Sequence, residues 1–527
     1  MKPLIYTIIE YQSFGADEIV KTWESQDKLL QSEQTPQKEK EERKKLLATK
    51  AEKFFQALEK FQKSTEQNDK FLKHCNATKL KAQNYVGIIQ TPYGTLEILP
   101  KCFRGDTFTQ DKKPLPLTNQ TEEEKKKELD KKAEIKKNKQ EHKKELAEFY
   151  EIKKFQQQFD LKDKQNQQEG TIIESFKRID TPQKSAQRFL IHCLTSLKDA
   201  PFKQSQISSI DTCNTPLLEV FMQMFCQELI KVCKKGIRHD YVAIEESRPY
   251  LKGKLLFSGQ IRHNLVHKER FYTSSDEYIT DIASNRLIKS TLELIHSKAT
   301  SHTTLTLINQ CLEVFEEIPS SGNIEGDFLS CTSSRHFSYY DNLLEWCKLF
   351  LQGNSFSAYS GENKAYALLF PMEKLFESYV AHMLKKSNPN ATIHAQNSSQ
   401  HLLYTKNNSP LFKLKPDLLF EIKEKEGKEK RKIVADTKWK PLKNAEDKKH
   451  GIAQSDLYQV FAYAHYHQAQ EVWLIYPKLY AQGDEKSDKE MGEIVKNIKD
   501  WNYHYKHKLF KDEKIEVKIF FAPLAFH

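Results

Sequence analysis

The hydrophobic pattern at the start of the chain is typical of β-strands. Residues 4–11 form a mostly apolar run, and two runs rich in β-branched residues follow at residues 85–90 and 95–99. Pro92 and Gly94 lie between the second and third runs and supply turn residues, so these two runs predict a strand pair. We therefore predict a small β domain near the N-terminus.

Two highly charged segments flank this strand pair, at about residues 35–81 and 121–164. In each segment, apolar residues return at helical intervals and form one narrow stripe. The stripes consist of Leu47, Phe54, Leu58 and Phe61 in the first segment, and of Leu146, Phe149, Ile152, Phe155 and Phe159 in the second. A narrow stripe with Lys and Glu on the other faces is typical of two helices that pack as a hairpin. We predict a long charged helical arm, with a disordered linker as the alternative.

The patterning of the remaining chain changes from helical to mixed at about residue 350. Helical periodicity rich in apolar residues covers about 181–238, 285–315 and 340–351. Beyond it, helices and strands alternate, which indicates a mixed sheet flanked by helices. The elements predicted there are a helix at 375–385, strands at 413–422 and 432–438, a helix at 457–466, and strands at 472–476 and 515–521.

These patterns predict a multidomain α+β protein, because 527 residues exceed the size of one ordinary core. The predicted domains are a β domain with the charged helical arm at 1–180, a mostly helical central domain at 181–350, and a mixed α/β domain at 351–527.

Composition indicates the kind of partner and the compartment to expect for this protein. The 83 Lys and Arg residues exceed the 72 Asp and Glu residues, and this excess suits a polyanionic partner, although a Lys-rich composition alone has the same effect. The nine Cys residues are scattered, with no pair two residues apart, which is typical of a reducing cytoplasm. Glu10 and Asp17 interrupt any apolar signal core, and no apolar run approaches the roughly 18–20 residues that span a bilayer. We expect a soluble, cytoplasmic protein with no membrane partner.

The candidate chemistry lies in two predicted strands of the C-terminal domain. Asp417 follows Pro416 in one strand, and Asp436 and Lys438 lie at the end of the next. Side chains alternate across a strand, so Asp436 and Lys438 project from one face, and a hairpin can bring Asp417 beside them. Two carboxylates and an ammonium form a hard-oxygen site suited to Mg²⁺. Lys438 would then orient or deprotonate an attacking water, or stabilise the charge that grows on phosphorus.

Each short motif also has a structural interpretation. An Asp-x-Lys at a strand end arises often by chance in a Lys-rich chain, but the order and spacing of both motifs favour a site. Glu377, on the preceding predicted helix, is a candidate third acid, with a solvated helical residue as the alternative. Gln459 and Tyr463 share one helical face, where they could reach a phosphate or the DNA backbone, or simply lie at the rim of a packed helix.

Together these residues resemble the signature of the PD-(D/E)xK nuclease superfamily, and Gln459-x-x-x-Tyr463 resembles the helix of its RecB-type branch. More specifically, the chain resembles the McrC family, the nuclease subunits of McrBC-type restriction systems directed at modified cytosine. This wider resemblance lies in residues 87–101, 238–264, 276–289 and 365–377. It implies an Mg²⁺-dependent endodeoxyribonuclease whose domain at 351–527 carries the catalytic residues Asp417, Asp436, Lys438, Glu377 and Gln459, with Asp417, Asp436 and Glu377 as metal ligands.

The resemblance also implies partners. McrC-like subunits dock on McrB, a hexameric AAA+ GTPase that carries the DNA-recognition domain, and they do so through their N-terminal part, here residues 1–180. The chain itself has no Gly-x-x-x-x-Gly-Lys-Ser/Thr phosphate loop, so GTP is expected on the partner. The expected partners are therefore DNA and an McrB-like GTPase hexamer, and the expected cofactor is Mg²⁺. We hypothesise that residues 121–164 dock on the GTPase.

The segment at 238–264 is rich in polar side chains. Arg248, Lys254 and Arg262 are candidate DNA contacts together with Tyr463, because basic and hydroxyl side chains commonly bind phosphates. The alternative is a structural hairpin with a glycine in its turn, in which acidic neighbours pair with the basic side chains.

Three other functions remain open at this point. The chain could be a stand-alone, RecB-like exonuclease without a GTP-driven partner. It could serve a system that recognises an unmodified, asymmetric site, since recognition belongs mainly to the partner. It could also be a non-enzymatic assembly subunit, although the intact Asp417, Asp436 and Lys438 argue against this.

Overall fold

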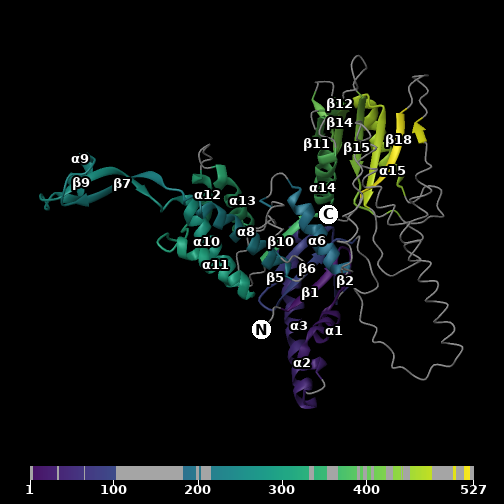
Figure 1. Cartoon of the computed structure of the whole chain (residues 1–527), viewed down its shortest axis with the longest axis horizontal. Coiled ribbons are helices and arrows are strands. Elements are labelled where there is room, and N and C mark those ends of the chain that lie inside the picture. Colours follow the sequence, from purple (N-terminus) through teal and green to yellow (C-terminus); the bar gives the residue numbers. More distant parts are fainter. Residues whose placement is uncertain are drawn as a thin grey trace, which may run out of the picture. The chain divides into compact units, whose positions relative to one another are not determined.

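The computed structural model contains both helices and sheets, as predicted for an α+β protein (Figure 1). It describes residues 4–32, 35–64, 66–76, 78–101, 182–197, 201–202, 210, 215–331, 338–352, 366–387, 392–395, 400–404, 409–422, 431–440, 442, 452–477, 503–505 and 515–522. The chain divides into two compact units, which are described separately. The first unit comprises Met1–Thr7, Gln12–Ile98 and Leu197–Phe370, and the second comprises Ile8–Tyr11, Leu99–Ser196 and Pro371–His527.

The predicted N-terminal strands form one sheet. β1 (Ile5–Ile9), β5 (Tyr85–Thr91) and β6 (Gly94–Leu99) confirm the predicted strand and strand pair, and β10 (Tyr366–Pro371) completes the order β1-β6-β5-β10. The close approach of β5 to β10 requires a glycine: Gly87 has φ +132°, and a Cβ there would lie 2.0 Å from the carbonyl oxygen of Leu368.

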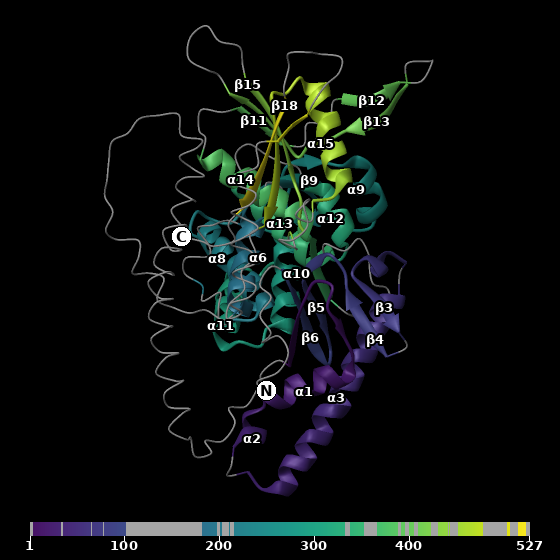
Figure 2. The same cartoon turned by 90° about the vertical axis from the view of Figure 1, so that its right-hand side faces the viewer.

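The first charged segment is helical over part of its length. α3 (Gln37–Lys63) lies beside α1 (Ala16–Gln26) (Figure 2). It buries the predicted stripe, and the ring of Phe54 stacks on that of Trp23 of α1, with 5.4 Å between centroids. A short helix, α2 (Lys28–Gln31), joins the two helices. The prediction of a continuous α-helix is wrong beyond Lys63, where a short 3-10 helix, η1 (Glu66–Lys70), is followed by two strands. These are β3 (Leu72–Asn76) and β4 (Lys79–Ala82), in a sheet of order β2-β4-β3 with β2 (Ser13–Phe14). The second charged segment lies outside the described residues.

Five central helices are present where the apolar periodicity predicted them. They are α6 (Pro182–Thr195), which belongs to the second unit, and α8 (Leu217–Cys233), α10 (Ala283–Lys298), α11 (His302–Val314) and α13 (Ser338–Gln352) of the first unit. α12 (Ile324–Ser330) was not predicted. Between α10 and α11 the backbone turns, and the Glu219 carboxylate accepts hydrogen bonds there from the amides of Thr300 and Ser301.

The central region also contains a sheet that the sequence did not predict. β7 (Asp240–Arg248) pairs antiparallel with β9 (Phe271–Ile279) along nine residues of each strand, and the short β8 (Lys254–Leu255) lies on the other side of β9. α9 (Phe257–Asn264) lies at the end of this ribbon (Figure 1). Gly253 adopts φ +75° before β8, as the hairpin interpretation expected. We call residues 240–279 the hairpin module.

The C-terminal part contains the predicted mixed sheet. Its order is β11-β14-β15-β16-β18-β17, parallel between β15 and β16 and between β16 and β18, and antiparallel elsewhere. The strands are β11 (Thr392–Ala395), β14 (Leu418–Ile422), β15 (Arg431–Thr437), β16 (Glu471–Pro477), β17 (Tyr503–Tyr505) and β18 (Ile515–Ala522), and the helices are α14 (Met372–Ser387) and α15 (Gln454–His467).

One predicted strand of this region is two strands. Residues 413–422 divide into β13 (Pro410–Leu414), which pairs with β12 (Gln400–Tyr404), and β14 in the large sheet. The break falls at Pro416, because a proline lacks the N–H that would continue a ladder. The break leaves Asp417 directly before β14.

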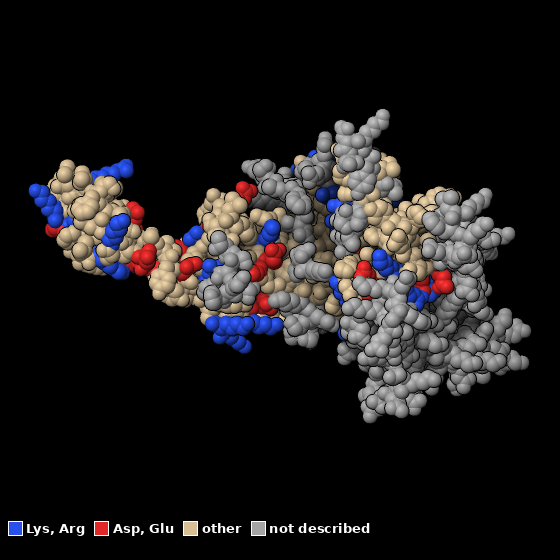
Figure 3. All heavy atoms as spheres, turned by 90° about the horizontal axis from the view of Figure 1, so that it is seen from above, with Lys and Arg blue, Asp and Glu red and all other residues tan. Residues whose placement is uncertain are grey.

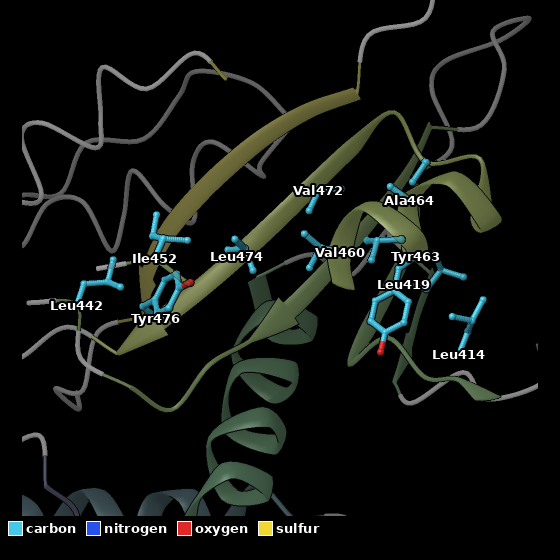
Figure 4. Packing of buried hydrophobic residues seen from close by; sticks show 12 residues of the cluster. Leu414, Leu419, Leu442, Ile452, Val460, Tyr463, Ala464, Val472, Leu474 and Tyr476 are labelled. Atoms are coloured by element: carbon cyan, nitrogen blue, oxygen red, sulfur yellow. The ribbon is translucent and has the colours of Figure 1, made fainter. Parts of the chain in front are cut away.

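α15 packs on the face of this sheet that carries the candidate residues. Val460, Tyr463 and Ala464 of the helix lie against an apolar cluster (Figure 4) that includes Leu419, Leu474 and Tyr476. Among the described residues, no helix is long and apolar enough to cross a bilayer.

Candidate active site

The paired ends of β14 and β15 bring the two predicted carboxylates together. Leu418 pairs with Ala435, so the register continued by one residue sets Asp417 opposite Asp436. Asp417 Oδ2 accepts hydrogen bonds from the amide and the hydroxyl of Thr437, both at 2.7 Å. These two bonds fix the carboxylate of Asp417 beside β15, which confirms the hairpin arrangement expected from the sequence.

The environment of Asp436 disfavours the charged form of its carboxylate. Its side chain is 2% exposed, and its Oδ2 lies 2.6 Å from Lys438 Nζ. This ion pair does not have hydrogen-bond geometry, so Oδ2 has no hydrogen-bond partner among the described residues. Burial, followed by the charge of Asp417, raises the pKa of Asp436 to about 6, against the opposing effect of Lys438. Burial also raises the pKa of Asp417.

Lys438 is held from two sides. Its backbone amide donates to the carbonyl oxygen of Ile475 at 2.9 Å, which extends the pairing of β15 with β16. Its Nζ donates to Gln459 Oε1 at 2.8 Å, and Gln459 Nε2 in turn contacts the hydroxyl oxygen of Tyr463 at 2.9 Å. Burial lowers the pKa of Lys438, but the neighbouring carboxylates, led by Asp436, outweigh burial and raise it. The predicted residues Asp436, Lys438, Gln459 and Tyr463 thus form one connected chain.

Asp456 and Lys440 were not singled out by the sequence analysis, although they join this cluster. Asp456 is buried in the first turn of α15, forms an ion pair with Lys440, and accepts a hydrogen bond from the Tyr476 hydroxyl at 3.3 Å. Its charge contributes to the pKa shifts of Asp436 and Lys438. The helical spacing of three from Asp456 to Gln459 was the available signal, since residues at i and i+3 share a face.

Glu377 lies half-buried on α14. Among the described residues, no group of three or more His, Cys, Asp and Glu side chains has the arrangement of a metal site. Glu377 therefore does not form a three-acid cluster with Asp417 and Asp436, and its role as a ligand stays a prediction.

The donor set nevertheless fits a hard divalent cation. Mg²⁺ is commonly held by one or two carboxylates, with waters and substrate phosphates as its other ligands. Two adjacent buried carboxylates, one with an oxygen that lacks a hydrogen bond, provide such donors. Burial and the charge of Asp417 raise the pKa of Asp436, and a cation bound between the two carboxylates would oppose both effects.

The candidate DNA contacts of the central segment belong to the first unit and have two different environments. Arg248 is 5% exposed and is paired with Glu246 and Glu277, and its Nη1 donates to the Ser275 hydroxyl at 3.0 Å. These contacts make Arg248 part of the internal structure of the hairpin module, as the structural alternative expected. Lys254 and Arg262 are exposed, with Lys252 and Lys268 nearby in the chain, and Figure 3 shows Lys and Arg side chains around this module.

Comparisons with known proteins agree on one family. A family model described as McrBC 5-methylcytosine restriction system component matches residues 80–477. The type IV methyl-directed restriction enzyme EcoKMcrBC of Escherichia coli (strain K12) is 24% identical over 177 residues, 33% of this chain and 48% of that protein. The chain thus spans about half the length of this curated relative.

One solved structure has a similar fold. A chain in a refined half-complex, from a tetradecameric assembly of Thermococcus gammatolerans McrB AAA+ hexamers with bound McrC, has a TM-score of 0.53 at 16% identity. The match covers 98% of this chain and 94% of that chain. The cryo-EM structure of the Thermococcus gammatolerans McrBC complex has a TM-score of 0.40 at 16% identity, over 72% of this chain and 87% of that one.

Proposed function

The chain belongs to the family of McrBC 5-methylcytosine restriction system components, and from this premise we propose that it is the DNA-cleaving subunit of such a system. The observation that carries the proposal is the contact of Asp436 with Lys438 beside Asp417, at the ends of two paired strands. Two acids and a lysine in this arrangement suit Mg²⁺-dependent hydrolysis of a phosphodiester.

Each residue of the cluster has a distinct part in the proposed mechanism. Asp417 and Asp436 would hold Mg²⁺, which when bound supplies Lewis-acid stabilisation of the phosphate charge. Lys438 has a raised pKa, so its ammonium is charged in the resting site and is better suited to stabilise developing negative charge than to remove a proton. Gln459 accepts a hydrogen bond from this ammonium and orients it toward the acids.

We place the GTP-driven step on a partner, an McrB-like AAA+ hexamer. The relative with a similar fold was solved among McrB AAA+ hexamers with bound McrC. The hairpin module has a surface suited to a protein partner, because Phe257, Ile261 and Leu265 recur at intervals of four and are 73%, 66% and 69% exposed. An apolar helix face of this kind is typical of a docking element.

Cleavage of plasmid DNA tests the proposal. The full chain is incubated with Mg²⁺, with and without the candidate GTPase and GTP, on 5-methylcytosine-containing and unmodified plasmid. We expect cleavage of the methylated plasmid only with partner and GTP. Asp436→Ala should abolish cleavage but keep assembly and GTPase stimulation, and Glu516→Ala, at an exposed carboxylate of the same unit, should cleave normally.

Other outcomes identify the alternatives. Loss of assembly in Asp436→Ala would assign this residue a structural role. Degradation of linearised plasmid from its ends by the chain alone would indicate a RecB-like exonuclease, and cleavage restricted to unmodified plasmid would indicate recognition of an unmodified site. No cleavage under any condition, with GTPase stimulation intact, would leave a non-enzymatic assembly subunit.

A further inference from the structure

Trp439, the residue next to Lys438, is enclosed by aromatic rings. Its indole lies parallel to the ring of Phe189 of α6, with 5.9 Å between centroids, and 5.1 Å from that of Phe376 of α14. Trp439 is 5% exposed. The side chain that follows the candidate catalytic lysine is therefore held between residues of two helices, α6 and α14.

The polar atom of this indole is held by a residue from the opposite end of the chain. Trp439 Nε1 donates to Glu10 Oε2 at 2.8 Å, a contact between residues 429 positions apart. The amide of Lys101 donates to the same oxygen at 3.2 Å, and the amide of Glu10 donates to the carbonyl oxygen of Leu99 at 3.0 Å. Glu10 follows β1 directly, and Leu99 is the last residue of β6. The buried carboxylate is therefore fixed by the ends of these two N-terminal strands.

This contact restrains the backbone of the site. Lys438 and Trp439 share a peptide bond, and the carbonyl oxygen of Lys438 accepts from the amide of Lys440 at 2.8 Å. A fixed indole therefore fixes the direction in which the chain leaves β15. The Lys438 ammonium must reach both Asp436 and Gln459, and a small rotation of this backbone would break one of the two contacts.

We propose that Glu10 and Trp439 are positioning residues for Lys438, and that through them the ends of the N-terminal strands influence the candidate active site. The inference rests on the proposed function for its effect on catalysis, but the placement of Lys438 can be measured without catalysis. Both N–H groups converge on one buried oxygen of Glu10, so the side chain restrains the indole through geometry whether or not it carries a charge.

The first test is the chemical reactivity of Lys438 in the isolated full chain, without DNA. Limited acetylation with acetic anhydride, quantified by mass spectrometry, reports how freely each ammonium leaves its partners. Glu10→Ala and Trp439→Phe should raise the labelling rate of Lys438 several-fold and leave that of Lys79 unchanged. Lys79 is the reference because its ammonium is paired with Glu18, in the first unit.

A matched control exists in the same unit. Trp473 Nε1 donates to Glu471 Oε2 at 3.0 Å, so Trp473→Phe removes the same kind of buried indole–carboxylate bond away from Lys438. It should leave Lys438 labelling unchanged. Glu10→Gln should also behave like the wild type, because its amide oxygen can accept both hydrogen bonds. Unchanged labelling of Lys438 in Glu10→Ala and Trp439→Phe, or an equal rise in Trp473→Phe, would overturn the proposal.

The second test measures cleavage. In the assembled complex, on 5-methylcytosine-containing plasmid, Glu10→Ala should lower the maximal single-turnover rate by about 10-fold or more, since residues that orient a functional group commonly have effects of this size. The DNA concentration at half-saturation should not change, and Glu10→Gln should restore the rate. A wild-type chain that does not cleave would refute the proposed function, while raised labelling of Lys438 would still support the positioning role.

Discussion

At the scale of single residues, two buried carboxylates have raised pKa values for related reasons. Loss of water is the largest cause for both Glu10 and Asp436. Asp436 has a second acid beside it and a lysine in contact, which suits a site that accepts a cation. Glu10 accepts two N–H groups, and Lys101 opposes the effect of burial on its pKa. The same physical cause thus acts at the proposed metal site and at the hydrogen-bonded carboxylate of Glu10.

The pKa of Glu10 predicts how stability depends on pH. Burial raises it from an ordinary value of 4.5 to about 7, with Lys101 opposing and Glu373 adding to the rise. The folded chain therefore binds this proton more tightly than the unfolded chain. The resulting stability is complete below about pH 4.5 and is lost as the pH rises through about 7.

Glu10→Gln removes this titration. Relative to the wild type, its free energy of unfolding should increase between pH 5 and pH 8, by up to about 3 kcal/mol. Urea denaturation at several pH values, in the presence of a chelator, measures the difference. Glu516→Gln is the control for loss of an exposed charge. A difference between Glu10→Gln and the wild type that does not vary with pH would contradict the prediction.

At the scale of elements, strand ends and close strand contacts decide the geometry. Pro416 separates the pairing of β13 with β12 from the pairing of β14 with β15. Asp417 therefore lies directly before β14 rather than in the middle of one long strand. In the N-terminal sheet, Gly87 allows β5 to approach β10, which is contributed by a segment almost 280 residues later. Each arrangement depends on one residue: Pro416 has no N–H to donate, and Gly87 has a positive φ.

Gly87→Ala should therefore destabilise the first unit. Its Cβ would meet a backbone oxygen, which cannot move as a flexible side chain can, and φ +132° is itself strained for alanine. We expect the free energy of unfolding to fall by at least about 2 kcal/mol. Thermal denaturation checks this, with Gly322→Ala as the control, because no atom lies within 4 Å of a Cβ at Gly322. Equal melting temperatures for the two variants would refute the argument.

At the scale of the whole molecule, the proposed catalytic and docking features fall in different units. The acid pair and Lys438 belong to the second unit, whereas the exposed apolar face of α9 belongs to the first. The proposed function requires both a site and a surface. The fold supplies the candidates for them from separate parts of the sequence.

The docking role of the hairpin module makes a whole-molecule prediction. The double variant Phe257→Ser, Ile261→Ser should weaken binding to the AAA+ partner by about 10-fold or more, because exposed apolar anchors dominate such interfaces. Its melting temperature should stay unchanged, since both side chains are exposed. Biolayer interferometry with the GTPase measures binding. Leu329→Ser, at an 87% exposed residue of α12, is the matched control, and equal loss of binding in both would contradict a specific role for α9.

The sequence by itself determined the elements whose residues carry a clear period. The stripe of α3, the apolar strands β5 and β6 and the order of acids and lysine were readable because burial on one face leaves a local pattern. That pattern was sufficient to predict that Asp417, Asp436 and Lys438 converge, and that Gln459 and Tyr463 share a face. The mixed class of the fold followed from the same periods.

Only the tertiary structure decided the contacts between distant segments. β7 is largely exposed on both faces, so no apolar alternation announced the hairpin module. The ion pair of Lys440 with Asp456 and the bond of Trp439 to Glu10 join residues 16 and 429 positions apart, and no local period records such a pairing. Periodicity reports which face of an element is buried, whereas the partner on the other side of that face is set by how the elements pack.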